Sequence, residues 1–432
     1  MGGGSEHVLV KQPLSSQFLE LPEGVSSALP GSIHRGICYP KGFVAGATAC
    51  GLKASGRGDL GVCAVAPEWR GKAASSVVTT RNSFAAAPIL LTRDGSARHL
   101  VGVAMNSGNA NACTGDEGRR IAKSMRAEFA QFLGVPDAQA GIASTGIIGR
   151  IPNEGFLLQG IRDACSVMSR EGEGAFAESI LTTDRFPKSW GVDVDLGGET
   201  VRIGGVAKGA GMIRPEMATM LAVITTDADI SPEQADVLVA KAVAATFNRI
   251  TVDGQMSTND CLFLLSSGAS GVTVSEAMMT RLGFGIEAVC KRLALMMLAD
   301  GEGARRIARI SVEGAAEEND AEVAARAIAD SPLVKTAIWG GDPNWGRVLS
   351  AAGAALPDRS FPQVALAMAG VQVVEDGTAS HLTVSETESL TQVMAGDEID
   401  IRLDLGVGDS AAEVFFSDMG YEYVRINAEY HT

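Results

Sequence analysis

Residues 204–227 read GGVAKGAGMIRPEMATMLAVITTD and lie at the middle of a chain of 432 residues. A glycine-rich run leads into Ala218 and Thr219, and an apolar run typical of a buried strand follows at 221–225. A threonine after a small residue suits a chain that cuts itself and uses the new terminal hydroxyl as a nucleophile. The freed amine, with a pKa of about 7.7–8.0, would act as its general base. A threonine that merely begins a buried strand fits the same pattern, so other residues must decide.

Helices and strands are predicted to alternate irregularly around this stretch. Apolar spacing predicts helices over 117–133, from Ser231 onward, and over 275–300 with a break near Gly283 and Gly285. Strand-like runs occur at 100–105, 201–203, 221–225, 262–265, 307–312, 364–369, 399–405 and 413–417. Because these elements lack the regular βαβ order of a doubly wound, Rossmann-type fold, we expect a layered α/β sandwich.

The charge distribution separates the two halves of the chain. Residues 1–218 carry 22 Lys and Arg against 20 Asp and Glu, whereas residues 219–432 carry 14 against 31. The halves would therefore attract each other if the chain were cut, although an acidic surface that keeps the protein soluble explains the same counts. No basic stripe is present, so nucleic-acid partners are not expected.

Several other classes of protein are also disfavoured. Seven cysteines without a CxxC pair predict reduced thiols, and neither a disulfide framework nor a metal site. The first residues lack the pattern of a signal peptide, and no apolar run approaches the roughly 18 residues of a membrane span. We therefore expect a cytoplasmic protein without a membrane partner.

Common catalytic motifs are missing as well. The five histidines form neither a nucleophile elbow nor an HExxH pattern, and the run at 204–211 lacks both phosphate-loop and dinucleotide fingerprints. The segment 143–149 reads ASTGIIG, in which glycine backbone amides and the Thr145 hydroxyl suit an oxyanion hole. An ordinary turn is the favoured explanation of that segment when it is taken alone.

The motifs together resemble the ornithine acetyltransferase family, also called bifunctional glutamate N-acetyltransferase. They occur in family order across almost the whole chain: NSGNANACTG at 106–115, STGIIG at 144–149, LTTDRFPK at 181–188, GVAKGAGMIRPEMATML at 205–221, FNRITVDGQMSTND at 247–260, DGEGARR at 300–306, GGDPNWGR at 340–347 and YVRINAEYHT at 423–432.

This resemblance implies self-cleavage between Ala218 and Thr219, with Thr219 as the acyl-carrying nucleophile. The fold it implies is an α-β-β-α sandwich, with residues 1–218 and 219–432 as separate chains and a C-terminal lobe from about residue 306. It implies an oxyanion hole formed by Thr145 and Gly146. The implied substrate-contacting residues are Thr182, Lys208, Thr219, Glu302, Asn427 and Thr432.

The implied reaction moves an acetyl group from N-acetylornithine to glutamate, with acetyl-CoA as an alternative donor and without a metal or prosthetic group. The implied assembly is an α2β2 heterotetramer of two cleaved pairs. The chain departs from the usual family pattern at Arg185, Ala210, Arg214, Glu216 and Gln255, which leaves the substrates less certain than the nucleophile. The alternatives are a self-processing amidase or peptidase, an acyltransferase with a different amino-acid substrate, and a non-catalytic relative.

Overall fold

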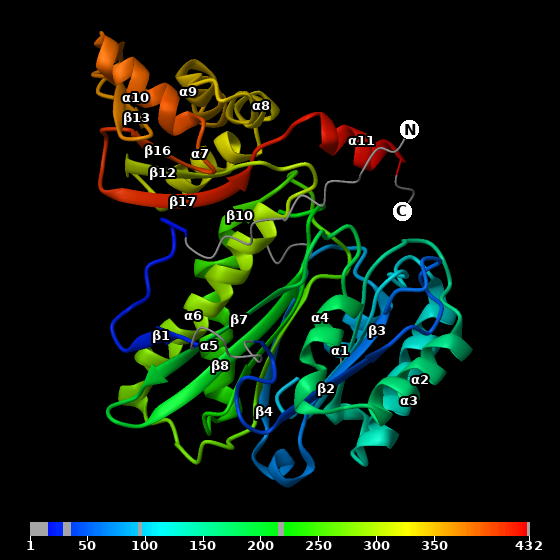
Figure 1. The fold of residues 1–432 in the computed structure, drawn as a ribbon. Coiled ribbons are helices and arrows are strands. Elements are labelled where there is room, and N and C mark those ends of the chain that lie inside the picture. Colours follow the sequence, from blue (N-terminus) through cyan, green and yellow to red (C-terminus); the bar gives the residue numbers. More distant parts are fainter. Residues whose placement is uncertain (1–15, 29–35, 94–96, 215–219, 430–432) are drawn as a thin grey trace, which may run out of the picture.

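Two β-sheets stacked face to face form the centre of the structure, a computed structural model that describes residues 16–28, 36–93, 97–214 and 220–429 (Figure 1). Within these ranges the first sheet has six strands, in the order β1 (Val25–Ser27), β7 (Lys188–Asp195), β8 (Thr200–Lys208), β9 (Leu221–Thr226), β11 (Cys261–Ser266) and β4 (Ala74–Thr79). The second has four, in the order β2 (Phe43–Thr48), β3 (Leu60–Val65), β5 (Gly102–Asn106) and β6 (Ala140–Ser144).

Alternating side chains show how the layers are packed. On strand β9, Leu221 and Val223 belong to the core between the two sheets, whereas Ala222 and Ile224 belong to the core on the opposite face. Strand β11 follows the same period of two, and its Phe263 is completely buried between the sheets. Strands buried on both faces read as continuous apolar runs, which explains the sequence of β9 and β11.

Helices cover both outer faces of this pair of sheets. Helices α5 (Pro232–Ala245) and α6 (Glu276–Ala299) pack on the first sheet, and α2 (Gly115–Leu133) and α3 (Glu154–Ser166) pack on the second (Figure 1). Two shorter helices, α1 (Ala87–Arg93) and α4 (Glu173–Ser179), contribute side chains to the core between the sheets. The predicted α-β-β-α layering, distinct from a Rossmann fold, is therefore confirmed.

A third sheet has its own apolar core and its own helices. Among the described residues its order is β10 (Ile250–Thr251), β17 (Ser410–Ser417), β12 (Ile307–Ala315), β16 (Glu398–Asp404), β13 (Ala365–Met368), β14 (Val371–Glu375) and β15 (Thr378–Ala379). The accompanying helices are α7 (Glu318–Asp330), α8 (Pro332–Gly340), α9 (Trp345–Ala355), α10 (Val384–Met394) and α11 (Tyr421–Glu429). The predicted division into two chains and a C-terminal lobe stays a prediction.

The helix predictions were mostly confirmed, with one correction. Helix α2 ends at Gly134, whose φ of 69° is favourable for glycine, and Ser231 forms a capping box at the start of α5. The predicted break in α6 was wrong, because the helix runs without interruption past both glycines. A Cβ atom at Gly285 would lie 2.4 Å from a Val194 methyl group, so this glycine lets the helix approach strand β7 closely.

The predicted strand over 399–405 is present as β16 and alternates between buried and exposed side chains as expected. The strict alternation of polar and apolar residues in this run predicts a half-exposed antiparallel strand. Strand β16 pairs antiparallel with β13 but parallel with β12, so that prediction holds on one side only. Across the described ranges, every helix is either too short or not apolar enough to cross a membrane.

Replacing Phe263 by alanine tests the core between the sheets. The substitution leaves a cavity where both sheets meet, and we expect it to lower the free energy of unfolding by about 3–5 kcal/mol. Urea unfolding monitored by circular dichroism would measure the loss. The matched control is Phe84→Ala, because Phe84 is 72% exposed; we expect a change within about 0.5 kcal/mol there. Equal effects of the two substitutions would contradict the packing described above.

Candidate functional site

A small polar pocket lies where strands β6 and β8 end, and it encloses about 100 Å³. Six residues singled out from the sequence line it together: Thr145, Gly146, Thr182, Lys208, Glu302 and Asn427. A larger cavity of about 610 Å³ lies between α5 and α7 and contains none of these six. We take the polar pocket as the candidate site, because its lining carries hydroxyl, amide and charged groups suited to chemistry.

Backbone hydrogen bonds fix the Thr145 end of the polar pocket. The Thr145 N–H donates to the Asn106 carbonyl at the end of the neighbouring strand β5 (2.9 Å). The side-chain amide of Asn259 donates to the carbonyl of the residue before Thr145 (2.8 Å). Gly146 has a φ of 126°, and a Cβ atom there would lie 2.5 Å from the Gly108 carbonyl carbon. Only glycine fits this close approach.

Lys208, the last residue of β8, brings a buried positive charge to the polar pocket. Its side chain is largely shielded from solvent, and its Nζ donates to the Thr145 hydroxyl oxygen (3.2 Å). Burial lowers the pKa of Lys208, while the nearby Asp184 carboxylate opposes that shift. An anionic group of a ligand would stabilise the charged form of this lysine.

Glu302 supplies the opposite charge. It follows helix α6, and its backbone N–H donates to the Ala210 carbonyl (2.9 Å). The Asn427 side-chain amide on α11 donates to its carboxylate (2.7 Å). A Cβ atom at Gly211 would lie 2.5 Å from the Glu302 carboxyl carbon, so a larger residue there would displace the carboxylate. The polar pocket thus presents both a cation and an anion to a ligand.

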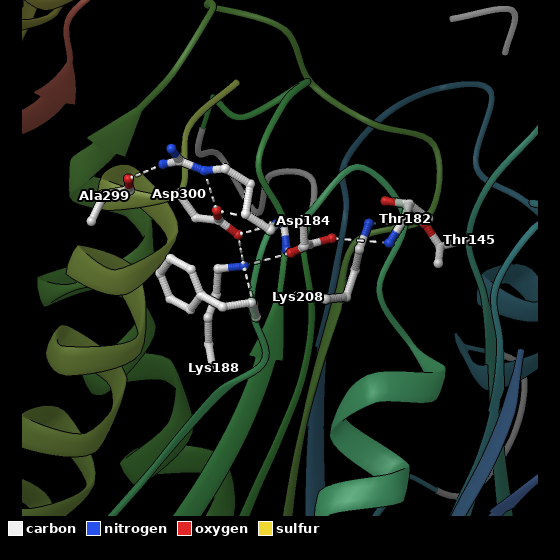
Figure 2. A network of polar contacts seen from close by, with 10 residues as sticks. Thr145, Thr182, Asp184, Lys188, Lys208, Ala299 and Asp300 are labelled. Atoms are coloured by element: carbon white, nitrogen blue, oxygen red, sulfur yellow. Dashed lines mark hydrogen bonds and ion pairs between the residues drawn. The ribbon is translucent and has the colours of Figure 1, made fainter. Parts of the chain in front are cut away.

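A buried ion network lies beside Lys208 and Thr182, on the side of Asp184 that faces away from Thr145 (Figure 2). The Lys188 ammonium is fully buried and lies 2.6 Å from carboxylate oxygens of both Asp184 and Asp300. Arg185 donates from Nε to Asp300 (2.9 Å) and from its terminal nitrogen to the Ala299 carbonyl (2.7 Å). Removing one partner from such a cluster would leave a buried charge without compensation.

Asp184 connects this network to the polar pocket. Its carboxylate accepts hydrogen bonds from the backbone N–H groups of Thr182 (3.0 Å) and Gly209 (2.7 Å), and thereby fixes both loops. Burial raises the pKa of Asp184, but attraction to Lys188 and Lys208 outweighs it and holds the pKa well below its usual value. The loops therefore stay fixed by an ionised carboxylate at neutral pH.

Sequence reasoning did not single out Asp184, Lys188 or Asp300 as site residues. A signal was available, since Asp184 and Lys188 stand four residues apart inside one of the quoted motifs. It also did not select Thr183, Ser257, Thr258 or Asn259, which line the polar pocket. Ser257, Thr258 and Asn259 stand in the quoted motif at 247–260, but turns contain the same residue types, so the sequence alone did not distinguish a site there.

Two departures from the usual family pattern take part in local ion pairs. Arg185 binds Asp300 as described above, and it also lines a neighbouring cavity of about 520 Å³ that shares Thr182 with the polar pocket. Arg214 lies 3.6 Å from the Asp330 carboxylate on α7 and lines the larger cavity rather than the polar pocket. Neither arginine lines the polar pocket itself.

Three predicted site residues lie outside the described residues: Ala218, Thr219 and Thr432. The residues that flank the predicted cleavage point are well anchored. Backbone N–H groups of Met212 and Ile213 donate to the Asp253 carboxylate (2.6 and 2.9 Å). On the other side, the backbone N–H of the first residue of β11 donates to the Met220 carbonyl (3.0 Å).

The described residues also contain no group of three or more His, Cys, Asp or Glu side chains placed to hold a metal ion. All seven cysteines are free thiols, and Cys113 is the exposed one among them. Burial raises the pKa values of Cys38, Cys63 and Cys290, so these thiols stay protonated and unreactive at neutral pH.

The layered α-β-β-α fold and a buried pocket with hydroxyls, a lysine and a glutamate define a class of α/β proteins suited to bind a small zwitterion. A comparison with protein families narrows this class. The ArgJ family matches residues 44–432, so the chain belongs to the ArgJ family.

Individual relatives show the same likeness. An arginine biosynthesis bifunctional protein ArgJ from Nitratidesulfovibrio vulgaris is 38% identical over 91% of this chain and 99% of its own length. A glutamate N-acetyltransferase from Methanosarcina mazei is 40% identical over 93% of this chain and 99% of its own length. A solved chain of ornithine acetyltransferase from Mycobacterium tuberculosis, complexed with ornithine, is 33% identical over 44% of this chain and 98% of its own, with a TM-score of 0.39.

Replacing Lys188 by methionine tests the ion network. Near neutral pH the two carboxylates lose their shared cation, and we expect the free energy of unfolding to fall by about 3–5 kcal/mol. Without that cation both carboxyl groups have raised pKa values, so they take up protons as the pH falls and the loss becomes smaller near pH 5. Urea unfolding at both pH values would measure this.

The matched control for Lys188→Met is Arg98→Met. Arg98 also forms ion pairs, but its own side chain is 52% exposed. Its removal should leave the unfolding midpoint almost unchanged. A loss in Lys188→Met that stays the same at both pH values would contradict the electrostatic explanation.

Proposed function

We propose that this chain is a glutamate N-acetyltransferase of arginine biosynthesis. In this proposal it cuts itself between Ala218 and Thr219, and Thr219 then carries the acetyl group of N-acetylornithine to glutamate. One observation carries the proposal: six residues selected from separate sequence segments line a single pocket with opposite charges. The names of its relatives, which include glutamate N-acetyltransferases, support the same activity.

Cleavage would proceed by a shift of the acyl group from nitrogen to oxygen. The Thr219 hydroxyl oxygen attacks the Ala218 carbonyl carbon, the carbon–nitrogen bond breaks, and the hydroxyl proton passes to the leaving nitrogen. The shift itself frees the amine of Thr219, and water then hydrolyses the resulting ester, which releases the carboxylate of Ala218 and restores the hydroxyl of Thr219. The amine, with a pKa of about 7.7–8.0, is partly neutral at physiological pH and serves as the base for the next reaction.

Acetyl transfer would use the same hydroxyl. It attacks the acetyl carbonyl of N-acetylornithine, and the terminal amine takes its proton and passes it to the departing nitrogen of ornithine. Lys208 donates to the Thr145 hydroxyl oxygen, so the hydroxyl hydrogen of Thr145 is available to the developing oxyanion. The Gly146 N–H is the second proposed donor. Glutamate then enters, its amine attacks the acetyl ester, and the Thr219 oxygen leaves with a proton.

The paired charges of the polar pocket suit both substrates. N-acetylornithine carries a carboxylate and a side-chain ammonium, so Lys208 and Glu302 can each meet an opposite charge. In the proposal Thr182, Asn427 and the terminal carboxylate of Thr432 complete the contacts. One site then serves both half-reactions, and Thr219 itself carries the acetyl group between them. Acetyl-CoA is proposed as an alternative donor.

A self-processing amidase would share the nucleophile and differ in the acceptor. Comparing the release of ornithine from N-acetylornithine with and without glutamate separates the two activities. Dependence on glutamate, together with formation of N-acetylglutamate, supports the transferase. Equal release without glutamate would identify water as the acceptor and overturn the proposed reaction.

We also propose that the mature enzyme is an α2β2 heterotetramer of residues 1–218 and 219–432. The opposite charge balance of the two segments supports their association after cleavage. Light scattering combined with denaturing electrophoresis would test it. A mass of two full chains, together with two fragments on the gel, is the expected result, and a mass of one full chain would contradict it.

Replacing Thr219 by alanine removes the proposed nucleophile. We expect the purified variant to stay as one 44.7 kDa band and to lose acetyl transfer by at least about 1,000-fold, since nucleophile and cleavage are lost together. Electrophoresis, N-terminal sequencing and a transfer assay would measure this. Thr219→Ser keeps a hydroxyl and is the matched control, for which we expect slower but detectable cleavage.

An acetylated Thr219 peptide after incubation of the wild type with N-acetylornithine would identify the intermediate. Acetyl transfer by an uncut wild-type chain would contradict the proposed mechanism.

Replacing Glu302 by glutamine removes the proposed partner of the substrate ammonium while it keeps the side-chain shape. We expect KM for N-acetylornithine to rise about tenfold or more, because a hydrogen bond between charged groups contributes about 1.5–3 kcal/mol. Steady-state kinetics would measure this, and cleavage should remain complete. Glu313→Gln on strand β12 is the matched control and should change neither value. An unchanged KM in Glu302→Gln would remove Glu302 from the proposed contacts.

A further inference from the structure

Asp260 is a buried carboxyl group that the proposed mechanism does not use. It directly follows residues 257–259, which line the polar pocket, and it directly precedes strand β11. Only 1% of Asp260 is exposed, and its Oδ2 has no hydrogen-bond partner among the described residues. Leaving a buried carboxyl oxygen without a donor is costly, so such an atom needs an explanation.

The strand pairing places Asp260 beside the chain that continues from the predicted cleavage point. Strands β9 and β11 are parallel, with Cys261 opposite Leu221, and the Cys261 N–H donates to the Met220 carbonyl (3.0 Å). Asp260 therefore stands at the level of Met220, one residue after Thr219 in the sequence. On the side of β9 away from β11, strand β8 pairs with β9 and places Lys208 opposite Leu221.

Few charged groups act on this carboxyl. Burial raises the pKa of Asp260 well above its usual value, and the Met220 backbone N–H, the Lys208 ammonium and Ser257 oppose the shift only partly. On its own strand the neighbouring titratable group is the Cys261 thiol. From the direction of β4, the backbone N–H of Thr80 donates to the backbone carbonyl of Asp260 and leaves the carboxyl group untouched. A further donor would relieve the cost of burying it.

We propose that Asp260 is a positioning residue for the main-chain nitrogen of residue 219. This inference rests on the proposed function, in which that nitrogen leaves during cleavage and afterwards acts as the base. The parallel pairing of β9 and β11 places Asp260 opposite Met220, the residue that directly follows residue 219 in the sequence. A newly formed amine at residue 219 has the N–H donors that the Asp260 oxygen lacks.

The chemistry balances without any further reactant. When the Thr219 hydroxyl gives its proton to the amine, an ammonium forms, and the Asp260 carboxylate stabilises that charge and holds one N–H in a fixed direction. The proton then leaves with the departing nitrogen of ornithine, and the amine is neutral again. Asp260 accepts a hydrogen bond throughout and does not itself react.

Asp260→Asn tests the proposal in the full-length enzyme. Asparagine keeps the size of the side chain but cannot offer a negative charge to the ammonium. We expect cleavage to slow, and in the cut enzyme we expect kcat to fall about 10- to 100-fold while KM changes less than about threefold. Because a neighbouring carboxylate raises the pKa of an amine, the acidic limb of the kcat/KM profile should move to lower pH, by about half a unit or more.

The matched control is Asp418→Asn, which lies beyond strand β17. Asp418 is 2% exposed, burial raises its pKa, and its Oδ2 also lacks a partner within the described part of the chain. Its other oxygen accepts from the Arg305 N–H (2.9 Å), away from Met220. This substitution therefore reproduces the loss of a buried charge without touching the predicted cleavage region.

The outcomes are distinct. Slower or absent cleavage, or the kcat and pH shifts, seen in Asp260→Asn but not in Asp418→Asn would support the positioning role. Wild-type cleavage, kcat and pH profile in Asp260→Asn would overturn it, as would the same defects in both variants. If the wild type is cut and its Thr219 becomes acetylated, a negative result concerns Asp260 alone. A wild type that is never cut would overturn the proposed function first, and this inference with it.

Discussion

The Lys188 ammonium, buried between Asp184 and Asp300, is the interaction on which the geometry of the polar pocket depends. A fully buried lysine is stable only if carboxylates compensate its charge. Here one of those carboxylates, Asp184, also holds the backbone of the Thr182 loop and of Gly209. The buried lysine that lines the pocket, Lys208, gains from the same negative charge. The Asp184 carboxylate thus both compensates buried lysine charge and fixes the backbone of two pocket loops.

Much of the fold could be predicted because its central strands are buried on both faces. Strands β9 and β11 appear as short apolar runs, and capping residues mark the helix that begins after Ser231. Helix α6 was harder, because glycine ordinarily disfavours a helix interior. Gly285 is instead required by the close approach of α6 to Val194, a tertiary contact that no local pattern contains.

The candidate site could be predicted in part, and for a different reason. Thr145, Lys208 and Glu302 were found through motif order, and the structure places them in one pocket although they are far apart in the sequence. The supporting residues were not selected: Asp184 and Lys188 stand in one quoted motif, but nothing in the sequence indicates that both lie beside Asp300. Asp260 shows the limit most clearly. Its sequence neighbours suggest a turn, and only the pairing of β9 with β11 reveals that it lies level with Met220.

Strand order also explains how a protein of this design could tolerate a cut in the middle of its chain. In the first sheet, β9 and β11 come from residues after 219, whereas their neighbours β8 and β4 come from residues before 218. Hydrogen-bonded ladders therefore join the two segments on both sides, over Ile203–Lys208 and over Ala74–Thr79. The core between the sheets contains side chains from both segments as well. Breaking one peptide bond leaves all of these contacts in place, so the ladders and the shared core hold the fragments together far more firmly than their opposite net charges do.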